Sequence, residues 1–347
     1  MSRIIGFLTR TRGRKGRLHW TDWLCYAYLG LAVLMMFGPV IWLVLSSFKT
    51  SADLERFPPR LLPYAQDVVT VAGQAAPLPA YRDAEGRVLG LVRRIGLVGQ
   101  LIDPEKPAEI VKLPMAELRP LERLQFAVSN YSGAFSSFNL PLYFGNSLVI
   151  TVTSTLIILL VNSMAAFALS KYRFRGRDAV LGLIIATLMI PHAVILVPLF
   201  LITSKLGLVD SLWGVIIPGS ATATGVFLLR QYMLTIPDEI LDAARMDKAS
   251  EWKIYWRIIL PLSAPALAVL AILAVMWRWN DFLWPLIVLT HHEDFTLQLA
   301  LYSFQGEMKT EWGKLLATTV FILTPMAVVF MFLQKYIATG IASTGGK

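Results

Sequence analysis

The stretch DAARMDKASEWKIYWRIILP, which runs from Asp242 to Pro261, is the one long polar run in a part of the chain that is otherwise apolar. It lies between two hydrophobic segments, and each of them approaches or exceeds the roughly 20 apolar residues of helix that cross a bilayer. A polar element that joins two membrane segments lies at the membrane surface. We therefore interpret it as a docking element for a soluble partner.

The apolar residues of the chain are gathered into long runs. Hydrophobic residues make up 56% of the 347 residues and charged residues only 16%, which is too apolar for an ordinary soluble domain. The runs are Leu24–Ser47, Leu140–Ser170, Ala179–Ser204, Ser211–Leu229 and Leu315–Gln334, all without Asp, Glu, Lys or Arg, and Leu262–Thr290, which contains Arg278 and Asp281. About six membrane spans are expected. They should be helices, because lipid offers no partner to an unpaired backbone group.

The net charge of +9 does not indicate a nucleic-acid-binding protein, because the basic residues follow the ends of the apolar runs. The clustered residues are Arg3, Arg10, Arg12, Arg14, Lys15 and Arg17 before the first run, Lys171, Arg173, Arg175 and Arg177 after the second, and Arg245, Lys248, Lys253 and Arg257 after the fourth. Cytoplasmic loops are enriched in Lys and Arg. Both termini, the second–third loop and the polar stretch are therefore expected in the cytosol.

The chain is expected to divide into five parts. They are a basic cytosolic tail at 1–22 that is attracted to anionic lipid, the first membrane helix and its exit at 23–60, an extracytoplasmic β-rich insert at 61–128, a transmembrane core at 129–338 with the polar loop at 235–261, and a cytosolic tail at 339–347. The insert is predicted from short β-branched runs that are separated by turn signals. It is either a decorative insertion or a contact for an external partner.

Local signals divide the polar stretch into two short helices. Thr235 can cap the first helix and Ser250 the second, and Asp242 and Arg245 are spaced for an i,i+3 ion pair. Pro261 is expected to end the second helix, because proline disfavours helix at the residue before it. The plain alternative is an amphipathic hairpin that only anchors the chain in the membrane interface, through Trp252, Tyr255 and Trp256.

Two parts of the stretch stand at a characteristic spacing. Asp242-Ala243-Ala244 is followed after three residues by Lys248 and, after nine more, by Ile258-Ile259-Leu260-Pro261. This pattern resembles the signature loop of the permeases of binding-protein-dependent ABC importers, which reads Glu-Ala-Ala, three residues, Gly, nine residues and Ile-x-Leu-Pro. Both ends match at the right spacing, so the resemblance is specific.

Further stretches are similar to the sugar-importer branch of that family, and most closely to the second permease subunit of maltose-type importers. They are Asn146–Leu148, Ala165–Leu169, Tyr172–Arg177, Met189–Pro191, Leu229–Tyr232, Ile236-Pro237 and Trp279–Leu286. The resemblance covers 24–60 and 129–347 and leaves out the insert at 61–128. It implies the all-α type I ABC importer permease fold with six transmembrane helices, here with the small β-rich insert after the first helix.

The resemblance also implies a role for the polar loop, which in this family sits in a cleft of the cytosolic ATPase and transmits ATP-driven closure to the membrane helices. The implied docking residues are Asp242, Ala243, Ala244, Asp247, Lys248, Ala249, Ile258, Leu260 and Pro261. Asp242 takes the place of the glutamate that pairs with a basic group of the ATPase. Lys248 takes the place of glycine, which costs roughly 1 kcal/mol if the position needs a positive φ. Either the turn is built differently or Lys248 adds a contact to the ATPase.

The implied assembly holds a cytosolic ABC ATPase dimer, a second homologous permease and an extracytoplasmic solute-binding protein, in the lipid of a bacterial inner (plasma) membrane. ATP and Mg²⁺ belong to the ATPase, so no cofactor is expected in this chain, and the chain is not expected to be an enzyme. The glycine-rich end from Gly340 to Lys347 is only superficially similar to a P-loop, because no strand precedes it and no helix follows. In maltose-type permeases such a tail reaches the ATPase interface.

A few polar residues lie inside the apolar runs. Asn162, His192, Asn280 and Asp281 are candidates for the translocation path, because ionisable groups in membrane spans are often functional. The alternatives are a hydrogen-bonded structural histidine and a self-satisfied Arg278–Asp281 pair. Pro191 and Pro198 are expected to bend the third run. Cys25 is the only cysteine, so neither an internal disulfide nor a cysteine metal site can form, and no metal site or catalytic set is predicted.

The sequence therefore predicts the permease subunit of an ATP-driven ABC importer for a sugar or sugar derivative. Two rivals are an ion-gradient-driven secondary transporter and a membrane scaffold that binds partners through the insert. A third reading keeps the ABC importer and changes the cargo to a non-sugar solute. The sequence alone does not separate a polyol, a phosphorylated or sulfonated sugar and an oligosaccharide.

Overall fold

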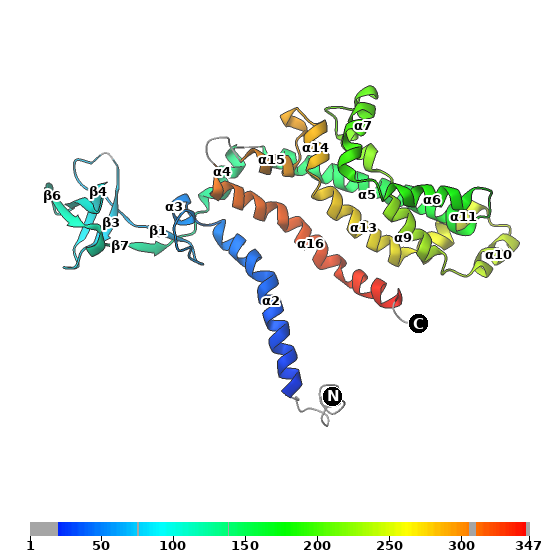
Figure 1. The fold of residues 1–347 in the computed structure, drawn as a ribbon, viewed down its shortest axis with the longest axis horizontal. Helices are drawn as coiled ribbons and strands as arrows, with labels where there is room; N and C mark the ends of the chain where they lie inside the picture. The colour runs from blue at the N-terminus through cyan, green and yellow to red at the C-terminus, as the bar shows by residue number, and fades with distance from the viewer. Residues whose placement is uncertain (1–19, 75, 138, 305–309, 345–347) are drawn as a thin grey trace. The chain divides into compact units, whose positions relative to one another are not determined.

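The computed structural model describes residues 20–74, 76–137, 139–304 and 310–344, and the chain divides into two compact units (Figure 1). The first unit comprises the chain up to Gly133 together with Glu311–Val320, and the second comprises Ala134–Thr310 and the chain from Phe321 onward. Most of the tail predicted at 1–22, and the last three residues of the tail predicted at 339–347, lie outside the described residues.

The first unit begins with one long apolar helix and continues into antiparallel strands. Its helices are α2 (Trp20–Ser46) and α3 (Ser51–Leu54), with the 3₁₀ turn η1 (Met115–Glu117), the part of α4 (Ser129–Ser137) up to Gly133 and the part of α16 (Trp312–Thr344) up to Val320. Its strands are β1 (Tyr64–Gln66), β2 (Val68–Val69), β3 (Leu78–Arg82), β4 (Val88–Ile95), β5 (Val98–Asp103), β6 (Lys106–Pro114), β7 (Arg119–Pro120) and β8 (Glu122–Leu124). The main sheet has the order β2-β3-β4-β5-β6 with β7 beside β3, and β1 pairs with β8.

Hydrogen bonds in the turns and a small apolar core stabilise these strands. The Asp83 carboxylate caps the β3–β4 turn by accepting hydrogen bonds from the backbone N–H groups of Glu85 and Arg87, at 3.0 and 2.9 Å. Strand β5 pairs with β4 and β6, with Leu101 opposite both Leu91 and Val111. Leu89, Leu101 and Leu118 form one buried cluster, and Val71, Leu78 and Ile102 form another. Two separate clusters of three residues are a small core, as a segment of this length allows.

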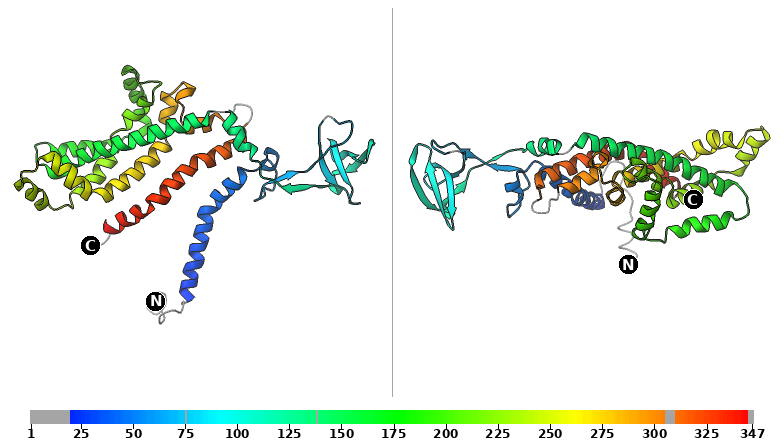
Figure 2. Two further views of the ribbon diagram at one scale, coloured as in Figure 1. Left: turned by 180° about the vertical axis from the view of Figure 1, so that it is seen from behind. Right: turned by 90° about the horizontal axis from the view of Figure 1, so that it is seen from above.

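The second unit is helical. Its elements are the end of α4, α5 (Leu140–Lys171), α6 (Arg177–Thr187), α7 (His192–Lys205), α8 (Leu212–Ile216), η2 (Ile217–Gly219), α9 (Ala223–Met233), α10 (Asp238–Met246), α11 (Glu251–Ile254), the π-helical turn η3 (Tyr255–Ile259), α12 (Leu260–Leu262), α13 (Ala264–Trp279), α14 (Leu283–Val288), η4 (His292–Asp294), α15 (Leu297–Ser303) and α16 (Trp312–Thr344), of which the residues from Phe321 belong here. Helices α9 and α13 both pack against α5, which is the longest element of the bundle they form (Figure 2).

Within the described residues, three helices are long and apolar enough to cross a membrane: α2, α5 and the 312–332 part of α16. Three pairs of shorter helices meet the same criterion together but are bent at a short break. They are α6 with α7 at 104°, α8–η2 with α9 at 43°, and the helix from Glu251 to Leu262 with α13 at 77°. By length and composition, the described part of the chain therefore offers three candidate membrane spans, or as many as six if each bent pair is one span.

The breaks differ in detail from what the sequence predicts. The bend predicted in the third run occurs at Pro191, which is the N-cap of α7, whereas α7 continues through Pro198. The run predicted at Leu262–Thr290 is not one helix: α13 ends at Trp279 and a short helix follows from Leu283. Freed backbone groups at such breaks need polar partners inside the membrane.

Candidate functional site

Helix α10 ends in a left-handed turn at Lys248. The N–H of Ala249 donates to the carbonyl of Ala244 at 3.0 Å and the N–H of Lys248 donates to that of Arg245 at 2.9 Å, which is the Schellman motif. Lys248 has a φ of 57°, a conformation that favours glycine because a Cβ crowds the backbone there. The turn therefore has the form that glycine would give it, and the alternative of a differently built turn is wrong. A contact of Lys248 with an ATPase stays a prediction.

Arg245 connects the two helices of the polar loop. Its Nη1 lies 3.3 Å from Asp242 Oδ1, which confirms the predicted i,i+3 pair, and its Nε lies 3.0 Å from Glu251 Oε1. The Asp242 side chain nevertheless stays 70% exposed. Three further predicted docking residues are exposed on α10 and its turn: Ala243, Asp247 and Lys248. The outer face of α10 is therefore accessible and carries both signs of charge.

The start of α10 is fixed by α5, not by the predicted cap. Pro237 occupies the N-cap position, and the Thr235 hydroxyl donates instead to the Tyr232 carbonyl at 2.7 Å, so the prediction that Thr235 caps this helix is wrong. The buried Lys171 lies 2.7 Å from Asp238 Oδ1. The hydrogen bond from Lys171 and its charge lower the pKa of the Asp238 carboxyl. Sequence reasoning missed this ion pair, because its partners are 67 residues apart.

The second helix of the loop begins as predicted but does not end as predicted. The Ser250 hydroxyl accepts a hydrogen bond from the N–H of Lys253, which confirms the cap. The prediction that Pro261 ends the helix is wrong, because the chain stays helical through Leu260 and Pro261 up to the cap at Ser263. The π turn η3 just before Pro261 widens the backbone, which relieves the clash between a proline ring and the carbonyl four residues earlier.

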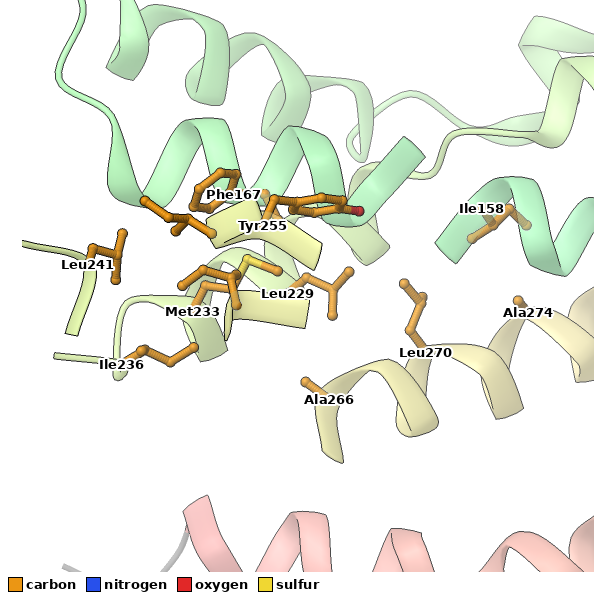
Figure 3. Packing of buried hydrophobic residues seen from close by; sticks show 13 residues of the cluster. Ile158, Phe167, Leu229, Met233, Ile236, Leu241, Tyr255, Ala266, Leu270 and Ala274 are labelled. Atoms are coloured by element: carbon orange, nitrogen blue, oxygen red, sulfur yellow. The ribbon is translucent and has the colours of Figure 1, made fainter. Parts of the chain in front are cut away.

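A buried apolar cluster joins the polar loop to the membrane helices (Figure 3). Leu241 of α10, with Ile254, Tyr255 and Ile259 of the second helix, packs with Phe167 of α5, Leu229 and Met233 of α9, and Ala266 and Leu270 of α13. The half-buried Ala244, Ala249, Ile258 and Leu260 pack against the same cluster, while Pro261 is exposed. Four of the predicted docking residues, Ala244, Ala249, Ile258 and Leu260, therefore face the core that supports the loop.

The aromatic residues of the second helix do not act as one interface anchor. Trp252 and Trp256 are exposed, but Tyr255 is 2% exposed and its hydroxyl lies 2.7 Å from Ser163 Oγ. On the neighbouring face, the Tyr172 hydroxyl donates to the Glu251 carboxylate. Burial and this contact raise the pKa of Tyr172 to about 12. The alternative of a hairpin that only anchors the chain in the membrane interface therefore does not hold for Tyr255, because its side chain is buried.

Asn162 lies at the junction between α5 and α9. It is fully buried; its Nδ2 donates to Thr222 Oγ1 at 2.8 Å, and its Oδ1 accepts from the Thr222 N–H at 3.1 Å. Thr222 is the N-cap of α9 and also binds the N–H of Gly225. In this conformation the Asn162 side chain reaches no surface, and its contacts are those of a residue that holds the start of α9.

The other candidates for the translocation path lie near helix breaks. Arg278 Nη1 is 3.4 Å from Asp281 Oδ2, so the predicted local pair is present, and Arg278 Nη2 donates to the Gly219 carbonyl at 3.0 Å. His192, the first residue of α7, is close enough to Asp281 for an electrostatic interaction. Asn280 is exposed and donates to the Met276 carbonyl at 2.8 Å. Three breaks in the bundle therefore contribute to one polar junction around Arg278 and Asp281, of which His192 is an exposed member, whereas the Asn280 side chain bonds back to its own helix.

This geometry can be compared with known proteins. The profile of the family described as "Binding-protein-dependent transport system inner membrane component" matches residues 158–343, which is more than half of the chain. The permease of the arabinooligosaccharides transport system of Bacillus subtilis (strain 168) is 38% identical over 219 residues, 63% of this chain and 78% of that protein. The permease of the lactose transport system of Rhizobium radiobacter is 32% identical over 211 residues, 61% of this chain and 77% of that protein.

A solved structure shares the fold. The crystal structure of a bacterial ABC transporter involved in the import of the acidic polysaccharide alginate contains a chain that matches 94% of this chain and 99% of its own length, with a TM-score of 0.68 and 22% identity. The profile match and the two relatives show that this chain belongs to the family of inner membrane components of binding-protein-dependent transport systems.

Proposed function

We propose that the chain is the transmembrane permease subunit of an ATP-driven ABC importer for a sugar or sugar derivative, and that residues 235–261 dock on the ATPase. The observation that carries the docking role is the accessible face of α10, with Asp242 70% exposed and Lys248 in the left-handed turn. Within the described residues, the side chain of Lys248 has no hydrogen bond or ion pair of its own. Such a face on a chain of this family suits a partner with charged groups of both signs.

The apolar cluster beneath this face explains how a partner could drive transport. Leu241 packs with Phe167 of α5 and with Leu229 of α9, and all three are almost fully buried. Packed cores deform little, so a displacement of α10 is passed on to the helices behind it. ATP hydrolysis would take place in the partner, and this chain would convert closure of the ATPase into alternating access.

The cargo is inferred from relatives. Relatives in the family include permeases for arabinooligosaccharides and lactose, and one for sn-glycerol-3-phosphate from Yersinia pestis bv. Antiqua (strain Antiqua) that is 33% identical over 201 residues. The first two favour a sugar or oligosaccharide. The third keeps a phosphorylated polyol as the alternative cargo.

The remaining features of the proposal concern topology and assembly. We count each bent helix pair as one span, which gives six spans, with both termini cytosolic and residues 61–128 outside the bacterial inner membrane. An even number of spans agrees with this orientation. The family's dependence on a binding protein supports an extracytoplasmic partner, and an ATPase dimer and a second homologous permease would complete the assembly.

Affinity purification of the tagged chain in mild detergent, followed by mass spectrometry, tests this proposal. We expect recovery of an ATPase and a second permease, and uptake in vesicles that requires ATP. The melting temperature of the cognate binding protein, measured across a panel of sugars and glycerol phosphates, would then identify the cargo. A chain that purifies alone and still carries out gradient-driven uptake would instead support a secondary transporter, and a chain without uptake and without an ATPase would support a scaffold.

A further inference from the structure

The turn between α5 and α6 forms a basic pocket at the end of an apolar helix. Arg173, Phe174 and four residues from Gly176 to Ala179 line a pocket of about 330 Å³, and Arg175 belongs to the same turn without lining the pocket. Arg173 and Arg175 are exposed, and neither forms a salt bridge within the described part of the chain. Arg177 pairs with Asp178, with Nε 3.1 Å from Oδ1, so this acid is already neutralised.

The neighbouring backbone adds to the positive field. Helix α6 begins after Gly176, which has a φ of 89°, and no side chain caps its first N–H groups. The N-terminus of a helix carries a partial positive charge that favours anions. Arg173 also acts electrostatically on Asp238, but that carboxylate already accepts a hydrogen bond from Lys171. The pocket therefore keeps an uncompensated positive charge.

An apolar surface continues from this pocket. Phe174 is 45% exposed beside the arginines, and Val180 and Leu183 on α6 are 45% and 70% exposed. Helix α6 belongs to one of the bent pairs that could cross a membrane. A free phosphate ion would use the arginines alone, whereas a phospholipid needs a cationic site for its headgroup next to an apolar surface for its acyl chains.

The geometry points to a binding site for the phosphate headgroup of an anionic phospholipid at Arg173 and Arg175, with the acyl chains along Val180 and Leu183 of α6. Each basic residue near a membrane surface contributes a modest attraction to anionic lipid. Two exposed arginines that are two residues apart, with no salt bridge to the described residues and an apolar surface beside them, give the turn a preference for anionic over zwitterionic lipid. The site lies outside the proposed docking face of α10 and does not depend on the cargo.

Native mass spectrometry of the chain, in whatever assembly it purifies with, tests this site. The probes are phosphatidylglycerol, phosphatidylcholine and inorganic phosphate, each titrated separately. We expect phosphatidylglycerol to bind the unchanged protein, phosphatidylcholine to bind far more weakly, and the double variant Arg173→Gln/Arg175→Gln to lose roughly tenfold to thirtyfold in phosphatidylglycerol affinity. Arg93→Gln/Arg94→Gln, a pair of exposed arginines on β4, is the matched control and should bind as the unchanged protein does.

Three results would overturn the inference. The first is equal phosphatidylglycerol binding by the Arg173→Gln/Arg175→Gln variant and the control. The second is displacement of the lipid by millimolar inorganic phosphate together with no effect of Leu183→Ala, which would assign the site to free phosphate. The third is loss of a copurifying protein in the Arg173→Gln/Arg175→Gln variant with lipid binding unchanged, which would assign the turn to a protein contact. None of these results bears on whether the chain transports a sugar.

Discussion

The guanidinium of Arg278 occupies the space that a side chain on Gly219 would need. Its Nη2 donates a 3.0 Å hydrogen bond to the Gly219 carbonyl, and a Cβ added at residue 219 would lie 1.5 Å from that nitrogen. Arg278 is also paired with Asp281 and is only 14% exposed. The end of α13 is thereby fastened to the break between η2 and α9, at a place where backbone groups need partners.

We predict that Gly219→Ala destabilises the protein by about 1–2 kcal/mol, because the Arg278 guanidinium must give up its hydrogen bond to the Gly219 carbonyl while it remains buried and paired with Asp281. Gly145→Ala is the matched control, since a Cβ there meets nothing within 4 Å. Thermal unfolding of the two variants in the same detergent is the measurement. Equal melting temperatures would show that a Cβ at residue 219 does not disturb the position of the Arg278 guanidinium.

The long apolar helices and the two short helices of the polar loop could be predicted from the sequence because they depend on local signals. Ser250 caps its helix and Asp242 meets Arg245 as expected, since each interaction joins residues three apart. The failures need knowledge of the surrounding fold. Pro261 does not end its helix, because a π turn precedes it, and Thr235 does not cap α10, because Pro237 takes that position. The positions of the helix breaks likewise depend on partners that are far away in sequence.

The left-handed conformation of Lys248 predicts which of two variants at this position is the more stable. Lys248→Gly should be more stable than Lys248→Ala by about 1 kcal/mol, because alanine keeps the crowded Cβ at positive φ and glycine removes it. Both variants lose the charge, so their difference isolates the backbone strain. Thermal unfolding measures it, and equal stabilities would contradict the φ of 57°. If Lys248 also contacts the ATPase, both variants should release the ATPase at lower salt than the unchanged protein.

The variant Asn162→Ala distinguishes a structural role of this residue from a role in the translocation path. Asn162→Ala leaves the Thr222 N–H at the start of α9 without its partner and removes one of the two hydrogen bonds that the Thr222 hydroxyl accepts. We therefore expect a loss of about 1–3 kcal/mol of stability with an unchanged KM for uptake. Asn280→Ala is the comparison: its side chain is exposed, and stability should change little. A higher KM for Asn280→Ala would support its place in the path. A higher KM with normal stability for Asn162→Ala would contradict the structural role.

The contacts of the Asp210 carboxylate predict that the stability of the folded protein depends on pH. Its Oδ1 accepts hydrogen bonds from the Thr290 N–H and, at 2.8 Å, from the Thr290 hydroxyl. These bonds lower the pKa of the Asp210 carboxyl below its ordinary value of 3.8. A lowered pKa in the folded state means that the stabilisation is fully present above the unfolded value and is lost as the pH falls through the folded value. The melting-temperature difference between the unchanged protein and Asp210→Asn should therefore shrink below about pH 4. A constant difference from pH 3 to pH 6 would contradict this role.

Asp242 and Ala244 test the docking loop directly. Asp242→Lys reverses the charge on the exposed face of α10, and Ala244→Trp forces a bulky ring into a half-buried position against the apolar cluster. We expect both variants to insert in the membrane in normal amounts and to lose uptake by at least tenfold, because the loop no longer fits its partner. Glu105→Lys, which reverses an exposed charge next to β6, is the control and should leave uptake unchanged. Both variants should also release the copurifying ATPase, Asp242→Lys through like charges and Ala244→Trp by deforming α10. Normal uptake by both variants would remove the docking role from residues 235–261.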